Sequence, residues 1–268
     1  MALMRAILAS RFLWACAAGL VCLGGARLVA RELARDRRFL ARPVRLEARA
    51  PAWADRAVVD PVLARLKAIG AINLFHPGFE RIVRDTVARE PAVASVGQVR
   101  RHWPRGYSVS FSLRRPYAVV LHAGRRIPVT REGIALPIAS YQEISRDLWT
   151  ILGIDSPAPH PGQAWKDARV EAAILAIVQI APFLGQLTPL GLEGVDAGQA
   201  ADPLQGVVLL GADGLRVRWG RPGATVGENS ADRKAAFLRL VAGDPQRARG
   251  FEVDVRFDEM GLRKSSAP

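Results

Sequence analysis

The chain has 268 residues, and half of them are apolar. That length and composition favour one or two folded domains and exclude a disordered chain. The formal net charge is +13, and 34 of the 38 basic residues are arginine. Ten arginines and three acidic residues fall within residues 1–50, which leaves that segment at +7 and the other 218 residues at +6. This excess surrounds an apolar segment, so it favours contact with anionic lipid headgroups over nucleic-acid binding, which needs a basic stripe on the folded part.

The apolar segment is residues 12–30, FLWACAAGLVCLGGARLVA. A helix needs roughly twenty apolar residues to cross a bilayer, so the segment predicts a transmembrane helix, with residues 1–11 as a short cytoplasmic N-terminus. The alternative is a cleaved signal peptide, with Arg5 and Arg11 as its charged region and residues 24–26 as its cleavage site.

The flanking charges conflict with an extracytoplasmic C-terminal side. Only two arginines precede the span, whereas eight lie between residues 27 and 49, and the positive-inside rule places the more basic side in the cytoplasm. The rule weakens for long translocated domains, so the sequence leaves the orientation open. Both cysteines, Cys16 and Cys22, lie in the span, so neither a disulfide nor a cysteine metal site is expected in the rest of the chain.

Residues 31–43 continue as a charged juxtamembrane helix or linker that ends at Pro43. Residues 44–116 then predict a small domain with the order strand, helix, helix, strand, strand. Its elements are expected at 44–48, 56–69 and 78–89, followed by a hairpin around Trp103-Pro104-Arg105-Gly106. The second hairpin strand alternates strictly between apolar residues and serines. This hairpin is expected to display a sheet edge that includes Val99, Arg100 and Trp103.

Residues 117–260 predict a β-rich domain with two helices, which makes the fold class α+β. Strands are expected at 117–122, 127–129, 134–136, 190–195, 206–210, 215–219 and 250–257, and helices at 167–184 and 232–241. Residues 261–268 read as a short polar tail.

No motif indicates catalysis, a metal or a cofactor. A nucleophile elbow, a P-loop and a dinucleotide-binding glycine motif are all missing from the sequence. The histidines do not pair at metal-ligand spacing; they are His76, His102, His122 and His160. Asp254 and Asp258 flank Arg256, which favours solvated carboxylates over an acid/base pair. We therefore expect a protein that is not an enzyme and binds neither a cofactor nor a small-molecule substrate.

Several short motifs, in this order, resemble the bacterial cell-division protein family FtsQ, also called DivIB. They are Asn73-Leu74-Phe75, Glu90-Pro91-Ala92-Val93, Val99-Arg100-Arg101-His102-Trp103-Pro104, Arg114-Arg115-Pro116-Tyr117-Ala118, Arg131-Glu132-Gly133-Ile134-Ala135-Leu136-Pro137, Lys234 and Asp254-Val255-Arg256-Phe257. Arg114 departs from the family, which usually has an acidic residue there. The resemblance implies a transmembrane helix, a POTRA-like domain over 44–116 and an FtsQ-type β domain over 117–260. It also implies a scaffold of the division machinery in the inner membrane, with its bulk periplasmic.

The segment 251–257, FEVDVRF, alternates and is expected to form a second exposed edge, with Val253 and Val255 on one face. The main-chain groups of such an edge can pair with a partner strand. The alternative is an internal strand whose side chains only pack. The resemblance places the partner-binding region at Arg256, Phe257, Asp258, Gly261 and Leu262. It implies small single-span coiled-coil partners of the FtsB/FtsL type.

Two other functions remain open at this point. The first is a different POTRA-bearing envelope protein that serves transport or assembly. The second is a membrane-anchored cell-wall enzyme, which a pocket joining Asp254, Asp258 and a tryptophan would favour.

Overall fold

The computed structural model describes residues 2–47, 53–202, 204–223, 227–245, 250–259 and 261–264, without the side chains of 2–13, 15–17, 42–47, 263 and 264. The fold is mixed α+β, as the sequence predicts. The chain divides into two compact units. One comprises Met1–Ala50 with Val59–Ser112, and the other comprises Pro51–Val58 with Leu113–Pro268. The division after Ser112 lies near the expected junction at Arg115-Pro116.

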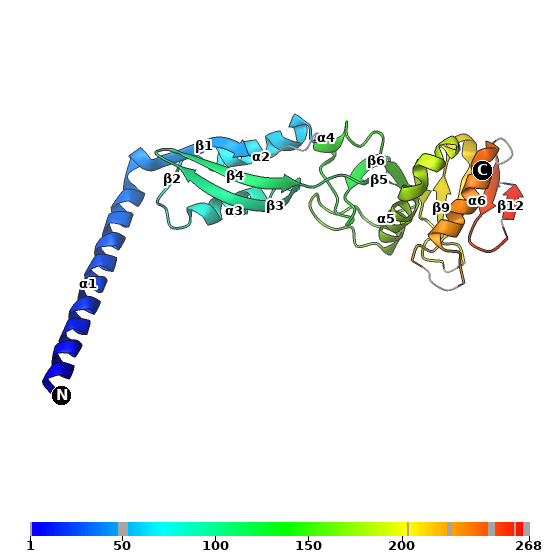
Figure 1. Ribbon diagram of the computed structural model, residues 1–268. Helices are drawn as coiled ribbons and strands as arrows, with labels where there is room; N and C mark the ends of the chain where they lie inside the picture. Colours follow the sequence, from blue (N-terminus) through cyan, green and yellow to red (C-terminus); the bar gives the residue numbers. More distant parts are fainter. Residues whose placement is uncertain are drawn as a thin grey trace. The chain divides into compact units, whose positions relative to one another are not determined.

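The first unit contains a long N-terminal helix, two shorter helices and a four-stranded sheet (Figure 1). Its elements are α1 (Ala2–Arg35), the 3-10 turn η1 (Arg37–Phe39), β1 (Leu40–Glu47), α2 (Arg56–Ala68), β2 (Ile72–Asn73), α3 (Phe79–Ala88), β3 (Val93–His102) and β4 (Gly106–Leu113). The expectation that the helix continues to Pro43 is wrong. The helix ends at Arg35 because the Asp36 side chain accepts a hydrogen bond from the Arg38 amide (2.8 Å) and caps η1 instead.

The apolar part of α1 has exposed side chains. Six large apolar residues of α1 are 60–75% exposed: Trp14, Leu20, Val21, Leu23, Leu28 and Val29. Within the described residues, the helical segment that is long and apolar enough to cross a membrane is Ala168–Gln186, which does not belong to α1. Ala168–Gln186 lines the core of the other unit, so packing explains its apolar composition.

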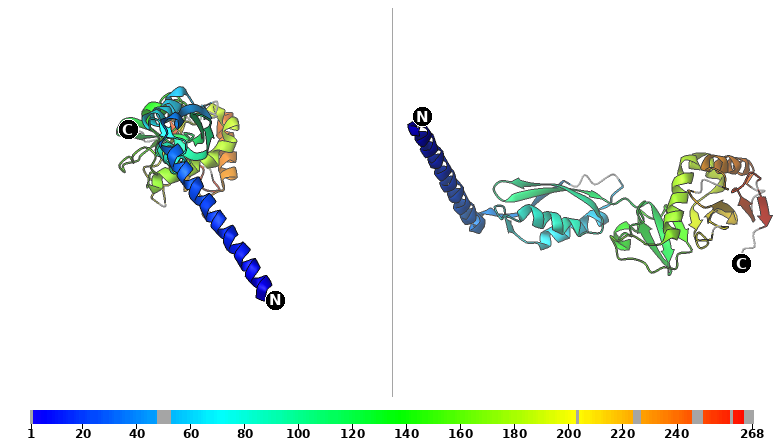
Figure 2. Two further views of the ribbon diagram at one scale, coloured as in Figure 1. Left: turned by 90° about the vertical axis from the view of Figure 1, so that its left-hand side faces the viewer. Right: turned by 90° about the horizontal axis from the view of Figure 1, so that it is seen from below.

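The sheet of the first unit has the order β2-β1-β4-β3, with β1 parallel to β4. The strand–helix–helix–strand–strand order agrees with the prediction, and the two-residue strand β2 is additional. Helices α2 and α3 lie on one face of this sheet (Figure 2), where Phe79 of α3 meets Tyr107 of β4 edge-to-face with ring centroids 5.3 Å apart. The same face is closed by buried residues at helical spacing on α2 and α3, which are Val58, Val62, Leu66, Val83 and Val87.

The second unit is an eight-stranded sheet with helices packed against it. Its elements are β5 (Ala118–His122), β6 (Arg125–Val129), α4 (Ile138–Tyr141), β7 (Trp149–Leu152), α5 (Ala168–Ile180), η2 (Ala181–Gln186), η3 (Thr188–Leu190), β8 (Gly194–Asp196), β9 (Val207–Leu210), η4 (Ala212–Gly214), β10 (Arg216–Gly220), α6 (Ala231–Gly243), β11 (Phe251–Asp254) and β12 (Gly261–Lys264). The strand order is β12-β11-β10-β9-β8-β7-β5-β6.

Several expectations for the second unit are corrected. Residues 134–136 do not form a strand and make only isolated bridges. Strand β7 and the short helix α4 were not predicted. Helix α5 ends at Ile180, because Pro182 stands in the 3-10 turn that follows. The polar tail expected from residue 261 is instead β12 as far as Lys264, and 265–268 lie outside the described residues.

The core of this unit lies between the sheet and the helices α5 and α6. Each of the inner strands contributes apolar side chains to it, and Val170, Ile174 and Ile177 of α5 lie opposite them. Trp219 of β10 is fully buried, and its indole N–H donates to Gln179 Oε1 (3.0 Å). This core fixes the sheet whose last two strands carry the candidate site.

Candidate partner-binding edge

The eight-stranded sheet ends at β12, not at the segment expected as its edge. Strand β11 pairs in parallel with β10 on one side and antiparallel with β12 on the other. The prediction that 251–257 forms an exposed edge is therefore wrong, because β11 is an inner strand of the sheet. The outer side of β12 forms no ladder with another described strand, so its main-chain groups offer a template for strand addition.

Val253 and Val255, two of the expected contact residues, belong to the core. Both are fully buried and pack in the same cluster as Val217 and Leu238. Their side chains therefore stabilise the sheet and are not accessible to a partner. The alternation of residues 251–257 correctly predicted one apolar face. That face packs against the protein's own core and not against a partner.

Arg256 is held inside the protein by three kinds of contact. Its Nε and Nη2 atoms donate to the two carboxylate oxygens of Asp254 (2.9 and 2.6 Å). Its Nη1 donates to the carbonyl of Leu204, and its guanidinium lies 5.0 Å from the ring centroid of Phe257. Burial alone would raise the pKa of Asp254, but the hydrogen bonds from Arg256 outweigh it and the pKa is lowered. Arg256 therefore positions the turn between β11 and β12.

The same turn is fixed from the other side by Asn229, a buried residue that precedes α6. Its side-chain amide donates to the carbonyls of Val255 (3.2 Å) and Phe257 (2.6 Å), and its backbone amide donates to the carbonyl of Arg256 (2.6 Å). Sequence reasoning missed Asn229, because its partners lie 26 to 28 residues further along the chain.

Four of the expected contact residues are accessible beside the edge. Phe257 is 51% exposed, and Leu262 of β12 is 54% exposed. Asp258 is exposed and lies 3.2 Å from Arg233 in an ion pair. Gly261, also exposed, begins β12 opposite Asp254. Next to them is a shallow hollow of about 560 Å³, lined by Gly227, Glu228, Asn229, Arg256, Phe257, Asp258 and Glu259. The edge and its surroundings thus combine main-chain groups, two exposed apolar side chains and a charged border.

A buried ion pair supports the back of this region. Lys234 is 3% exposed, and its Nζ donates to Glu228 Oε2 (2.8 Å) and to the carbonyl of Trp219 (2.6 Å). Lys234, one of the FtsQ-like motif residues, therefore makes a structural contact between α6 and β10.

In the first unit, β3 is the outer strand of its sheet. Val99 is buried, and Arg100 is exposed with its Nε bonded to Gln98 (3.0 Å). Trp103 is not part of that edge, because it lies in the turn after β3. Ser110 of β4 donates to the carbonyl of Gln98 and accepts from its amide, which ties β3 to β4 through a side chain.

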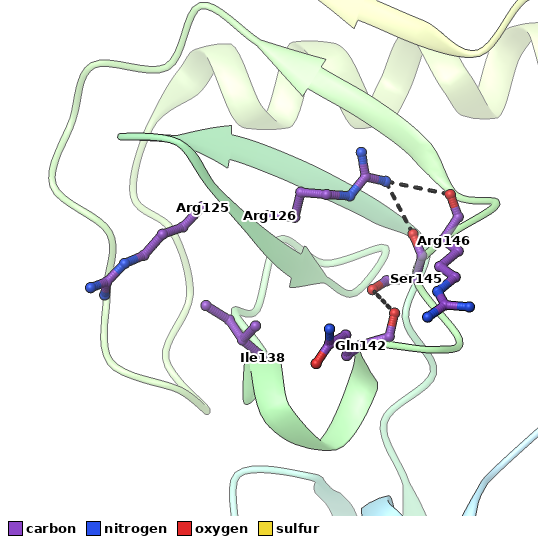
Figure 3. Close-up of a pocket in the computed structure, with 6 residues that line it drawn as sticks. All are labelled: Arg125, Arg126, Ile138, Gln142, Ser145 and Arg146. Atoms are coloured by element: carbon purple, nitrogen blue, oxygen red, sulfur yellow. Dashed lines mark hydrogen bonds between the residues drawn. The ribbon is translucent and has the colours of Figure 1, made fainter.

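A cell-wall enzyme of the kind considered above would need Asp254 and Asp258 in one cavity. Asp254 pairs with Arg256 and Asp258 pairs with Arg233, so each carboxylate has its own arginine and the two share no cavity. A second hollow, of about 540 Å³, lies between β6 and α4 (Figure 3). There Arg126 donates to the carbonyls of Ser145 and Arg146, whereas Arg125 points away from them.

The arginines of this second hollow do not form a free anion site. Arg146 pairs with Glu143 at 2.8 Å, and the Arg126 guanidinium bonds to main-chain carbonyls and to Thr150. Within the described residues, no three His, Cys, Asp or Glu side chains gather closely enough to hold a metal ion.

Neither a scan against protein-family models nor a search of curated proteins finds a match to this chain.

Proposed function

We propose that this chain is a membrane-anchored scaffold of the bacterial cell-division machinery that binds a partner by strand addition at β12. The observation that carries the proposal is the end of the eight-stranded sheet at β12, where Phe257 and Leu262 are exposed beside an unpaired strand edge. The partners are small single-span coiled-coil division proteins of the FtsB/FtsL type. The scaffold catalyses no reaction. It joins its partners, and a partner bound at β12 marks the assembled state.

The exposed apolar side chains of α1 support membrane anchoring. Full burial of a leucine- or valine-sized side chain stabilises by about 1.5–3 kcal/mol, so a helix exposing six large apolar residues needs an apolar environment. Residues 12–30 of this helix span about 28 Å at 1.5 Å per residue, close to the thickness of a bilayer core. In this proposal the rest of the chain lies outside the cytoplasmic membrane.

The assignment to cell division rests on the FtsQ-like motifs, and their structural roles support it. Asn73 bonds to the end of α1, Lys234 joins α6 to β10, and the Asp254–Arg256 pair fixes the turn before β12. The order β1, α2, α3, β3, β4, with β1 parallel to β4, also suits the POTRA-like domain that the resemblance implies.

The test is localisation of a fluorescent N-terminal fusion in growing cells of the source organism. We expect a band at the division site that is lost when Phe257→Glu and Leu262→Glu are combined. Leu240→Glu is the matched control, because Leu240 is a 69% exposed leucine on α6 that lies outside the edge. An even envelope signal through the cell cycle would overturn the division assignment, and an unaffected band in the double variant would overturn the role of β12.

A further inference from the structure

Three aromatic residues that are far apart in the sequence meet at one end of the first unit. The ring centroids of Phe39 and Phe75 are 5.1 Å apart, those of Phe39 and Trp103 are 5.1 Å apart, and those of Phe75 and Trp103 are 6.1 Å apart. Trp103 is 69% exposed, and the two phenylalanines are partly exposed. This aromatic cluster lies outside both sheet edges and is not used by the proposed partner site.

Four hydrogen bonds hold the aromatic cluster against the C-terminal end of α1. The Asn73 side-chain amide donates to the carbonyls of Leu33 (2.9 Å) and Asp36 (2.8 Å). The Leu74 amide donates to the carbonyl of Phe39 (2.9 Å), and Arg105 Nε donates to the carbonyl of Arg38 (3.0 Å). The segments that carry Phe75 and Trp103 are therefore fastened to the residues that immediately follow the helix.

The surroundings of the cluster are basic. Exposed arginines in the adjoining segments are Arg31 and Arg35 in the last turns of α1, Arg37 and Arg38 before Phe39, and Arg105 after Trp103. Two acidic residues, Glu32 and Asp36, lie in the same segment, which leaves a net charge of +3 from five arginines and two acids. Asp36 is partly occupied by capping η1, and Glu32 pairs with Arg35 at 3.3 Å.

The position of the cluster suits the headgroup layer of a membrane. From Ala30, the last residue of the apolar segment, to Arg35 the helix rises about 7.5 Å, and a headgroup layer is about 5–8 Å thick. Tryptophan is enriched at that level because its ring is amphipathic, and arginine side chains there contact lipid phosphates. An exposed tryptophan on two phenylalanines, with exposed arginines in the adjoining segments, has the chemistry of an interfacial contact and not that of a protein core.

We propose that the aromatic cluster of Phe39, Phe75 and Trp103 inserts into the headgroup layer of an anionic bilayer and seats the first unit on the membrane surface. The inference rests on the proposed function only in that α1 is the membrane anchor. Anionic lipid binds through Arg37, Arg38 and Arg105, and the aromatic rings lie among the headgroups. The occupant is thus anionic lipid.

The test uses the full-length chain in vesicles whose lipids carry bromine close to the glycerol backbone, where bromine quenches nearby tryptophans. The parent variant is Trp14→Phe, which removes the tryptophan of the span and leaves five of the six. We expect brominated vesicles of phosphatidylcholine and phosphatidylglycerol to quench part of the emission, and Trp103→Phe in addition to abolish that quenching. Trp53→Phe, the matched control, should leave it unchanged.

The charge requirement is tested in the same vesicles. Arg37→Glu with Arg38→Glu should lower the quenching severalfold, whereas the matched reversal of two exposed arginines of α3, Arg81→Glu with Arg84→Glu, should not. Vesicles of phosphatidylcholine alone should give less quenching than the anionic ones.

The possible results separate the inference from the anchor on which it rests. A chain that floats with the vesicles but shows no quenching dependent on Trp103 would overturn the inference and leave the anchor intact. A chain that fails to float with vesicles of either composition would overturn the anchor itself. Equal quenching in neutral and anionic vesicles would overturn the anionic lipid as the occupant.

Discussion

Replacing Asn229 with alanine should loosen the candidate edge without touching any exposed residue. The change removes the two side-chain hydrogen bonds to the carbonyls of Val255 and Phe257, of which the first is buried and the second partly so. A buried polar group left without a partner costs about 1–3 kcal/mol, so the two together should cost about 2–4 kcal/mol. That cost falls on the turn that joins β11 to β12.

The measurement is amide hydrogen exchange of the full-length chain in detergent, followed by mass spectrometry. A loss of about 2–4 kcal/mol corresponds to exchange about 30- to 1,000-fold faster in residues 255–264 if they open as one local unit. Helix α5 should change far less, because its contacts do not involve Asn229.

The control is Ser230→Ala, one residue further on. Ser230 caps α6 by accepting from the Arg233 amide, so this change should cost about 1 kcal/mol and speed exchange in the first turn of α6 only. Exchange in 261–264 that is equally slow in Asn229→Ala and in the unaltered chain would refute the reasoning, because β12 would then not depend on the fixed turn.

Three further predictions concern stability. Lys234→Met should destabilise the second unit by up to about 3 kcal/mol in urea unfolding, the low end for a broken buried pair, because the buried Glu228 carboxylate loses Lys234 and keeps only Arg221 at 3.7 Å; adding Glu228→Gln should recover part of that loss. Hydrogen bonds from Arg169 lower the pKa of Asp167 from 3.8 to about 2, so the stabilisation by this carboxylate should be complete above about pH 4 and lost as the pH falls to 2; Asp167→Asn should remove that part of the acid-unfolding curve. Phe79→Ala should destabilise the first unit by about 3–5 kcal/mol and leave thermal unfolding of the second unit unchanged, because Phe79 is fully buried against the sheet of the first unit alone.

Periodicity predicted the elements that have one buried face. The helical spacing of α3 corresponds to a buried stripe, and the apolar residues Tyr107, Val109 and Phe111 of β4 are buried as its alternation predicts, although Ser108 on the other face is buried as well. Alternation cannot tell an inner strand from an edge strand, because either has one buried face and one open face in a sheet covered by helices on one side. This is why 251–257 was expected at the edge, whereas β11 has a neighbour on each side.

The sequence of the edge strand, β12, has almost no pattern that predicts a strand. β12 has four residues, Gly261-Leu262-Arg263-Lys264, with a single apolar side chain, and it forms by pairing with β11 across a turn. β7 is equally short and lies between two parallel neighbours, so its partners come from distant parts of the sequence. Contacts of this kind depend on topology, and local propensity does not encode them.

Contacts between residues close in the sequence were more accessible to sequence reasoning than contacts between elements. Asp254, the last residue of β11, and Arg256 are only two residues apart, which keeps their ion pair local to the sequence. The aromatic cluster is not local, since Phe39, Phe75 and Trp103 come from three separate segments. The motifs had marked two of those three residues, Phe75 and Trp103, without indicating that they touch.

At the β12 edge, some residues hold the strand in place and others are exposed to a partner. Ordering a flexible backbone costs about 1–2 kcal/mol per residue, so a four-residue edge that became ordered only on binding would lose about 4–8 kcal/mol of affinity. Arg256 and Asn229 reduce that cost, because they hold the turn in place before a partner arrives. Replacing either should therefore weaken binding together with local stability, whereas charge placed at Leu262 should weaken binding alone, since that side chain is 54% exposed. Phe257→Glu should fall between the two, because the Phe257 ring also contacts the guanidinium of Arg256.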